Sequence, residues 1–478
     1  MLTISRSVLR RFRTLCRRGG LHKTHVTGGP VVTFVGGADG CRIRAASIDV
    51  AIEFHDPAPS GDETVRLPLA ALELCEGRDD GLVTIDVRDD EQVWLSWNDR
   101  GVPRQSEQSQ PKQGTTSFPA APTTQIANEA RLWSDLGDAV ATTDAQASRY
   151  ALGCLHFRGA LGHIETTDGR QVLVQSDFRF GFEEDVLVPG SKLLGGADMG
   201  TVEEVTVGRT EDYVGFGVDR WLILLRIQKD ARFPKIEQIL PNPDFAKSRL
   251  ELSPVDAGFL KETIPRLPCD DTLHDPITLD LNGRVLVRSR ETATSRPTEV
   301  LLGSSKLTGE PVQLNTNRRF VERALKLGFR SVCLFGPDSP AMSVDEHRRF
   351  LWALLDKKSA IPRHDDPQRI DAPSRVDIGN SARIVTTKPK ESVMSVSLPV
   401  VARSTSKPSE TTDIQPERSV DARTAVSAIE QVLTLRDTLR TAAQQAGELA
   451  RSLKQQKRQS RIVASTLASL KELQRVAG

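Results

Sequence analysis

The order of secondary-structure patterns repeats along most of this chain. A helix-like segment followed by several strand-like runs recurs about three times, at a period of about 120 residues. The last copy is the clearest: the helix-like segments "PVDAGFLKETIPRL" and "TNRRFVERALKLGF" alternate with apolar runs such as "SVCLFGP". Repetition on this scale restricts the fold, because each copy has to form the same unit of helices and strands. We therefore predict three repeated domains of mixed α and β structure.

Changes in composition give the predicted boundaries. The polar stretch "GVPRQSEQSQPKQGTTSFPAAPTT" separates the first two copies, and a proline-containing stretch, "FPKIEQILP", follows the apolar run "WLILLRI" at the end of the second. We predict domain I over residues 1–103, a linker over 104–125, domain II over 126–241 and domain III over 242–357.

The rest of the chain has a different composition. Residues 358–420 are rich in Pro, Ser, Thr, Arg and Asp with few large apolar residues, so we predict a disordered linker. From Val432 to Leu470, apolar residues follow a 3–4 spacing, which predicts a coiled-coil helix over 421–478. The alternative is an amphipathic helix that folds back on its own protein.

Charge is balanced overall but not locally. The chain has 64 Lys and Arg against 63 Asp and Glu, whereas the first 23 residues carry several Arg and no acid. That composition fits an organellar transit peptide. It also fits a structural helix whose apolar face contains Val8, Leu9, Phe12, Leu15 and Cys16.

Motifs for catalysis and for metal binding are missing from the sequence. No phosphate-binding loop, strand-anchored GxGxxG, HExxH or GxSxG occurs, and the eight histidines are dispersed. The six cysteines are far apart, without metal-ligand spacing, and no apolar run is long enough to span a bilayer. We expect a soluble cytoplasmic protein with reduced thiols, no metal, no cofactor and no catalytic residues.

Several motifs of the second and third copies resemble one known family. They are the turn "TTDGR" between two strands, "FPKIEQILP" at the junction, and "GEPVQLNTNRRFVERALKLGFRSVCLFG" in the third copy. Together they resemble the bacterial DNA sliding clamp, the beta subunit of DNA polymerase III, across residues 1–357. The sequence departs from the family at Arg170, Gln171 and Val172, where the family has His, Arg and Leu. Trp352, Ala353 and Leu354 replace its terminal Met-Pro-Met.

The resemblance implies an α+β fold of three clamp-type domains in a ring, usually a head-to-tail homodimer, with helices lining the hole and antiparallel sheets outside. Lining helices contact DNA phosphates without reading bases. The implied DNA-binding residues are Arg10, Arg13, Arg17, Arg131, Lys192, Lys261, Arg266, Arg318, Arg319, Arg323 and Lys326. For each one alone, a solvated helix face is the alternative interpretation.

A second implied surface is a hydrophobic pocket between domains II and III that accepts linear peptides of partner proteins. Its walls would be Ala151, Thr167, Arg170, Val172, Pro241, Phe350 and Trp352. The alternative is that Trp352 fills the pocket itself.

Two functions follow from the resemblance. The first is a processivity factor in DNA replication that encircles double-stranded DNA in the nucleoid and tethers DNA polymerase and clamp loader subunits through linear peptides. Any polymerase or exonuclease activity would then belong to the associated polymerase complex. The alternative is a clamp-derived, non-replicative scaffold that oligomerises or recruits partners through its coiled-coil tail.

Overall fold

The computed structural model describes residues 1–23, 30–88, 91–111, 117–146, 150–269, 271 and 274–373. The chain divides into two units, Met1–Thr386 and Thr387–Gly478, and all described residues belong to the first. The predicted coiled coil over 421–478 lies outside the described residues, as does most of the predicted disordered linker.

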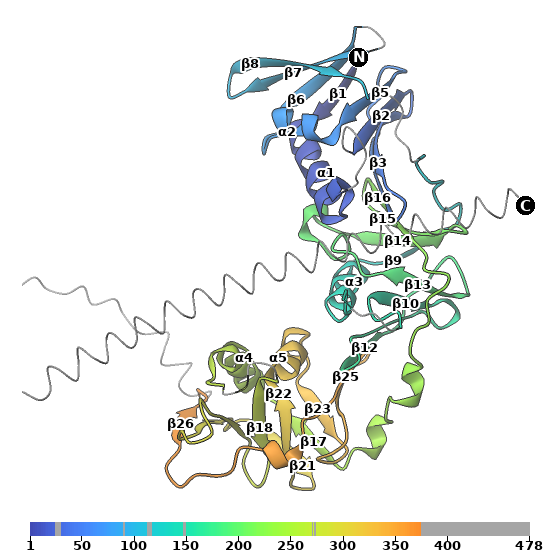
Figure 1. Cartoon of the computed structure of the whole chain (residues 1–478). Coiled ribbons are helices and arrows are strands. Elements are labelled where there is room, and N and C mark those ends of the chain that lie inside the picture. The colour runs from blue at the N-terminus through green and yellow to red at the C-terminus, as the bar shows by residue number, and fades with distance from the viewer. Residues whose placement is uncertain are drawn as a thin grey trace, which may run out of the picture. The chain divides into compact units, whose positions relative to one another are not determined.

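Domain I consists of two four-stranded antiparallel groups and two helices (Figure 1). Its elements are β1 (Leu2–Ser5), α1 (Arg6–Arg18), β2 (Val31–Gly37), β3 (Gly40–Ala46), β4 (Val50–Asp56), β5 (Thr64–Pro68), α2 (Leu72–Cys75), β6 (Leu82–Val87), β7 (Gln92–Asp99) and β8 (Val102–Ser109). The strand orders are β1-β6-β7-β8 and β5-β2-β3-β4.

Domain II repeats this order with one change. Its elements are β9 (Gln125–Glu129), α3 (Arg131–Val140), β10 (Cys154–Arg158), β11 (His163–Thr167), β12 (Gln171–Gln175), β13 (Asp185–Pro189), the 3-10 turn η4 (Ala197–Met199), β14 (Glu204–Arg209), β15 (Tyr213–Val218) and β16 (Trp221–Arg226). A loop that contains η4 therefore takes the place of a second helix in this domain.

Domain III has both helices and an addition after its last strand. Its elements are β17 (Ser248–Glu251), α4 (Pro254–Thr263), β18 (Pro276–Asp280), β19 (Leu286–Ser289), β20 (Thr298–Leu301), β21 (Lys306–Gly309), β22 (Gln313–Asn317), α5 (Arg318–Lys326), β23 (Ser331–Leu334), β24 (Ala341–Val344) and β25 (Arg348–Trp352). The 3-10 turns η7 (Ile264–Arg266) and η8 (Lys357–Ser359) and a further strand, β26 (Gln368–Asp371), complete the described part.

Neighbouring domains are joined by strand pairing. Strand β4 of domain I pairs antiparallel with β16 of domain II, and β12 of domain II pairs antiparallel with β25 of domain III. The joints create one eight-stranded and one nine-stranded sheet that continue across the domain boundaries.

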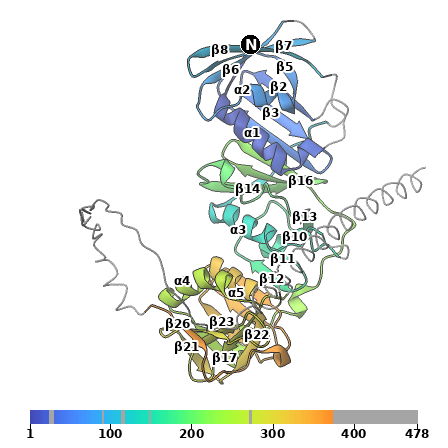
Figure 2. The ribbon, with the colours of Figure 1, turned by 60° about the vertical axis from the view of Figure 1, so that its left-hand side comes forward.

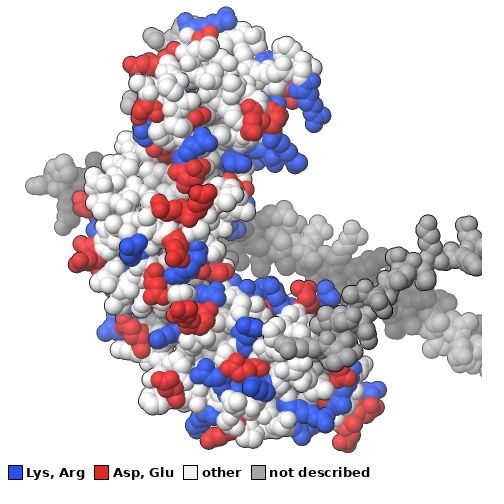
Figure 3. All heavy atoms as spheres, turned by 180° about the vertical axis from the view of Figure 1, so that it is seen from behind, with Lys and Arg blue, Asp and Glu red and all other residues white. Residues whose placement is uncertain are grey.

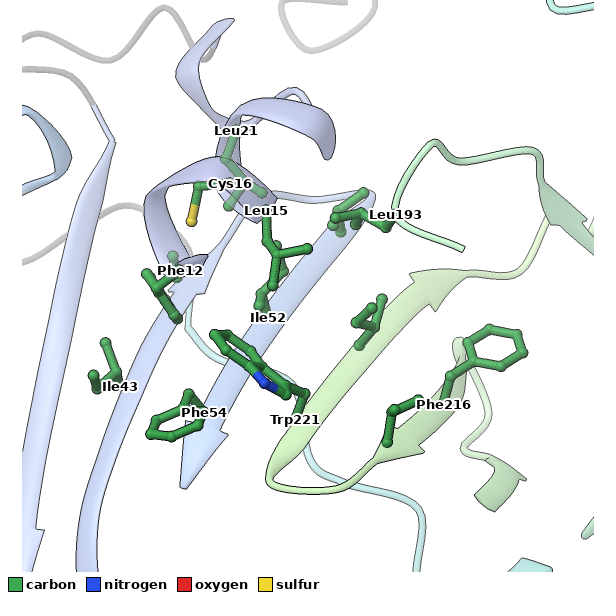
Figure 4. Close-up of a cluster of buried hydrophobic side chains, with 14 of the residues drawn as sticks. Phe12, Leu15, Cys16, Leu21, Ile43, Ile52, Phe54, Leu193, Phe216 and Trp221 are labelled. Atoms are coloured by element: carbon green, nitrogen blue, oxygen red, sulfur yellow. The ribbon is translucent and has the colours of Figure 1, made fainter. Parts of the chain in front are cut away.

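Helix α1 packs over the joint between domains I and II (Figure 4). Its buried residues include Phe12, whose ring centroid lies 6.3 Å from that of Trp221 on β16, and Leu15. Trp221 in turn lies 4.6 Å from Phe54 on β4. The structural helix predicted for the N-terminal segment is confirmed, because its apolar face is part of the core shared by the two domains.

The helices follow one another along one side of the sheets (Figures 1 and 2). Arg18 of α1 forms an ion pair with Asp198 of η4, and Trp133 Nε1 of α3 donates to the Gly196 carbonyl at 2.9 Å. Arg323 of α5 donates to the Asp138 carbonyl of α3 at 2.6 Å, and α5 contacts α4. We call α1, η4, α3, α5 and α4 the helical row.

Two predicted boundaries are wrong. Strand β8 pairs with β7 from Val102 to Ser109, so domain I does not end at 103 and the linker does not begin at 104. This strand is polar and mostly exposed, and it therefore lacks the apolar alternation that reveals a half-buried strand. The prediction of disorder from residue 358 is also wrong for its first part, because β26 pairs with β20.

Candidate nucleic-acid interface and partner pocket

Helix α1 is the most basic element of the helical row. Ser5 caps its N-terminus by accepting a hydrogen bond from the Ser7 amide, and Arg17 and Arg18 lie in the last turn, where cations are favoured by the helix dipole. The helix contains no acidic residue. Arg10, Arg11, Arg17 and Arg18 are exposed.

Two other arginines of α1 are buried and hold domain I together. Arg6 donates to Asp79 at 3.0 Å and to Asp99 at 3.2 Å. Arg13 is 6 % exposed and makes a two-point contact with Glu76, at 2.7 and 3.0 Å. Arg13 therefore does not share the exposed face of Arg10, and the prediction that it contacts DNA is wrong.

Two predicted contacts on α5 are likewise structural. Arg318 is 5 % exposed and donates to carbonyl oxygens of the segment after α4, including that of Pro268 at 2.8 Å. Arg323 donates to Asp138 O and, at 3.1 Å, to Thr142 Oγ1 of domain II, and burial lowers the pKa of its guanidinium. These side chains hold helices and domains in place and are not free to contact phosphate.

The other predicted cations differ in how far acids neutralise them. Arg131 pairs with Asp135 at 3.2 Å and lies over the ring of Phe178. The cations Arg319, Lys326 and Arg266 are exposed, and their acid partners are Asp275, Glu322 and Glu262 respectively.

Three exposed cations of the row, Arg10, Arg11 and Lys261, form no ion pair with another described residue, and neither does exposed Lys192 next to the row. Lys192 lies in the loop of domain II before η4, and Arg11 is exposed although it is not among the predicted DNA contacts. On the face shown in Figure 3, acidic and basic side chains are interspersed. Free positive charge in the row is therefore concentrated on α1.

An apolar cluster lies at the joint between domains II and III. It contains Val172 and Val174 of β12, Met342 of β24, Leu351 of β25 and Ile236 of the segment between the domains. Phe233 and Leu240 of the same segment pack against it, half-buried. We call this group the seam cluster. In Figure 1 the segment that carries Ile236 passes on the side of the sheet away from α3 and α5.

The register of the joint separates the predicted pocket residues. Val172 pairs with Leu351, while Leu173 pairs with Phe350 and Gln171 with Trp352. Because successive side chains of a strand point to opposite faces, Phe350 and Trp352 lie on the face away from the seam cluster. The prediction that they line the pocket is wrong.

Trp352 does not fill the pocket either. It is 2 % exposed in the core of domain III, its ring centroid lies 5.5 Å from that of Phe350, and its Nε1 donates to Thr316 Oγ1 at 3.2 Å. Leu351, which is not among the predicted wall residues, lies on the face that the sequence predicts for these aromatics. A one-residue error in register moves a side chain to the other face of a sheet.

The remaining predicted wall residues lie around the seam cluster. Ala151 is buried in a small neighbouring cluster that Phe233 also contacts, and Pro241 is half-buried. Thr167 is buried, and its hydroxyl donates to the Gln171 carbonyl at 2.6 Å, which stabilises the turn that exposes Arg170. Whether these residues contact a partner stays a prediction.

The linker between domains II and III, residues 227–247, crosses the seam cluster and is anchored to domain II. Arg158 forms an ion pair with Glu237, and the Phe233 ring centroid lies 4.7 Å from that of His156. Ile236 is 1 % exposed, whereas Ile239 and Phe245 of the same segment are exposed. The linker therefore covers part of the cluster and also presents apolar side chains to solvent beside it.

Comparison with solved structures identifies the architecture. A DNA polymerase sliding clamp from Pseudomonas aeruginosa matches with a TM-score of 0.62 and 16% sequence identity, covering 74% of this chain and 99% of that one. The beta subunit of the Streptococcus pyogenes DNA polymerase matches with a TM-score of 0.62 and 13% identity, with coverages of 74% and 99%. The chain has the fold of the bacterial sliding clamp. The clamp from Bacillus subtilis matches similarly, with a TM-score of 0.60, 15% identity and coverages of 74% and 98%.

The clamp fold accounts for the threefold repetition of helices and strands predicted from the sequence. No protein-family model matches the sequence, and no curated protein matches it. Within the described ranges, no group of three or more His, Cys, Asp and Glu side chains is placed to hold a metal ion. No helix in that part of the chain is both long and apolar enough to cross a membrane.

Proposed function

We propose that this chain is a clamp-like processivity factor that encircles duplex DNA and tethers replication or repair proteins to it. The observation that carries the proposal is the basic face of α1, which belongs to a continuous helical row in a clamp fold. Arg10 and Arg11 are exposed, and neither pairs with an acid among the described residues. Such side chains favour contact with phosphates independently of base sequence.

A ring would form from two copies arranged head to tail. The two joints inside the chain are built alike. In each, an edge strand of one domain, β4 or β12, pairs with the last strand of the next domain, β16 or β25. By that pattern, β20 of domain III corresponds to β4 and β12, and β8 of domain I corresponds to β16 and β25. Pairing of β20 with β8 of a second copy would close the ring.

Partner proteins would bind at the seam cluster through short linear peptides. Val172 and Leu351 supply an apolar floor, and the linker beside it presents exposed Ile239. An apolar anchor residue of a peptide gains most where it is removed from water in such a pocket. We assign the chain no catalytic reaction, and any polymerase or nuclease activity would belong to its partners.

A charge-neutralising variant tests the DNA role. Replacing Arg10 and Arg11 by Gln should make the negative slope of log K against log salt for duplex DNA shallower by about 1.8, since each lost phosphate contact contributes about 0.9 to its magnitude. The matched control replaces Arg226 and Arg232, which are exposed and lie outside the helical row. If both double variants change the slope equally, α1 has no special role and the proposal loses its support.

A clamp-derived scaffold is the second candidate. The observation that favours it is β26, which covers the β20 edge that the ring would use. Comparison of the hydrodynamic mass of the full chain with that of a chain ending at residue 373 tests self-association through the tail. Equal numbers of protomers in the two would argue against the scaffold.

A further inference from the structure

The β20 edge of domain III is occupied by a segment of the same chain. Strand β26 pairs with β20 in parallel, from Thr298↔Gln368 to Leu301↔Asp371. The Gln368 amide donates to the Pro297 carbonyl and the Ala372 amide to the Leu301 carbonyl, each at 2.9 Å. All other strand pairs between described strands are antiparallel, including both joints between domains. We call residues 361–373 the strap.

Few buried contacts hold the strap. Ile361 is 2 % exposed, and its amide donates to Thr278 Oγ1 at 2.7 Å. Beyond it, all four residues of β26 are exposed, and half-buried Ala372 packs on the rim of the domain III core. The strap can therefore leave β20 from Arg363 onward without opening the core of domain III.

Ion pairs between the strap and domain III stabilise the position of the strap. Asp280 and Glu299 are buried beside a single buried cation, Arg288, so this part of domain III has an excess of negative charge. Arg363 of the strap binds Asp280 at 2.9 Å, and Arg369 lies 3.7 Å from Glu299. On the edge of the sheet, Arg296 binds Asp366 of the strap at 2.6 Å.

The strand that would compete for the same edge is β8. It is the terminal strand of its sheet and carries no neighbour on its outer side within the described residues. It is polar and contains Pro103, whereas its counterparts in the two internal joints, "WLILLR" and "RRFLW", are rich in apolar residues. Prolines and polar side chains on an edge weaken association between sheets.

We propose that the strap is an intramolecular substitute for β8 of a second copy, and that its release from β20 permits head-to-tail closure of two chains. This inference rests on the ring form of the proposed function, and it adds a step that regulates closure of the ring. A tethered strand acts at a millimolar effective concentration, so it prevails over a weak edge strand from another molecule. The chain alone is then held open, and whatever draws the strap away favours the ring.

Hydrogen exchange of the full chain tests the proposal. Ile370→Pro removes an amide from the middle of β26, and its exposed position leaves the core intact; Ile370→Val is the matched control. We expect the amides of β8 in Ile370→Pro to exchange about tenfold more slowly as protein concentration rises. In wild type and in Ile370→Val, these amides should exchange at rates independent of concentration.

Unchanged exchange in β18 and β19 of Ile370→Pro shows that domain III stays folded. A second strap variant, Arg363→Ala with Arg369→Ala, should protect β8 in the same way. If β8 gains no protection in either variant, or is already protected in wild type, the proposal is overturned. If chains associate through the tail instead, exchange of the β8 amides should stay unchanged. If β8 is protected in the strap variants but the protein is not retained on DNA, only the proposed DNA function is contradicted.

Discussion

Val172 of β12 lies opposite Leu351 of β25 in the joint between domains II and III. This pairing places both side chains in the seam cluster on one face of the nine-stranded sheet, and it places Phe350 and Trp352 in the core of domain III on the other. The joint is therefore an interdomain connection, and one of its faces carries the cluster that we propose as the partner-binding surface.

Truncation of Trp352 tests the assignment of faces. Because Trp352 is buried in domain III, Trp352→Ala should lower the free energy of unfolding by about 3–5 kcal/mol. Arg349→Ala, on the same strand but exposed, should change it by less than about 0.5 kcal/mol. Denaturant unfolding, with hydrogen exchange in domain III as the local probe, measures both. A near-neutral Trp352→Ala would mean that the side chain is not in the core.

Removal of Arg323 tests the helical contact between domains II and III. Arg323→Ala deletes two hydrogen bonds from a charged donor, to Asp138 O and Thr142 Oγ1. Each loss should lower the free energy of unfolding by no more than about 3 kcal/mol. We expect faster exchange in α3 and faster protease cleavage of the 227–247 segment. Arg330→Ala, an exposed control beyond the same helix, should alter neither rate. Equal behaviour of the two variants would contradict the proposed role of Arg323.

Acid should release the strap. Burial raises the pKa of Asp280, but its hydrogen bonds with Arg363 and Arg288 outweigh that effect and lower the pKa from 3.8 to about 2. Because the folded pKa lies below the ordinary value, the stabilisation is fully present above about pH 4 and is lost as the pH falls toward 2. Protection factors of β26 amides should fall in that window.

The variant Arg363→Gln gives the control for the acid effect. Without this guanidinium the strap has no cation beside Asp280, so strap protection should be lower at neutral pH and should lose most of its dependence on pH between about 4 and 2. Identical pH profiles for the two proteins would show that Asp280 does not hold the strap.

Part of this structure follows from the sequence for clear reasons. The three domains and the α1, α4 and α5 helices were predictable because repetition and apolar periodicity survive in the residues that form them. Strand β8 was missed because its side chains are polar on both faces. The strap was missed because β26 depends on pairing with β20 and on arginine contacts with Asp280 and Glu299, not on a local pattern.

The candidate sites were less predictable than the fold. A sequence does not separate an arginine such as Arg13, which neutralises Glu76 in the interior, from Arg10, which faces solvent three residues away. The pocket face depended on the register of β12 against β25, which only the paired strands determine.

Retention on circular DNA tests the central claim, that the chain encircles duplex DNA, most directly. The full chain, as wild type and as Ile370→Pro, is bound to nicked circular DNA, washed at high salt, and followed before and after a single cut that linearises the circle. We expect protein to resist the wash on the circle, in greater amount for Ile370→Pro, and to be lost once the DNA is cut. Equal dissociation from circular and linear DNA would contradict encirclement.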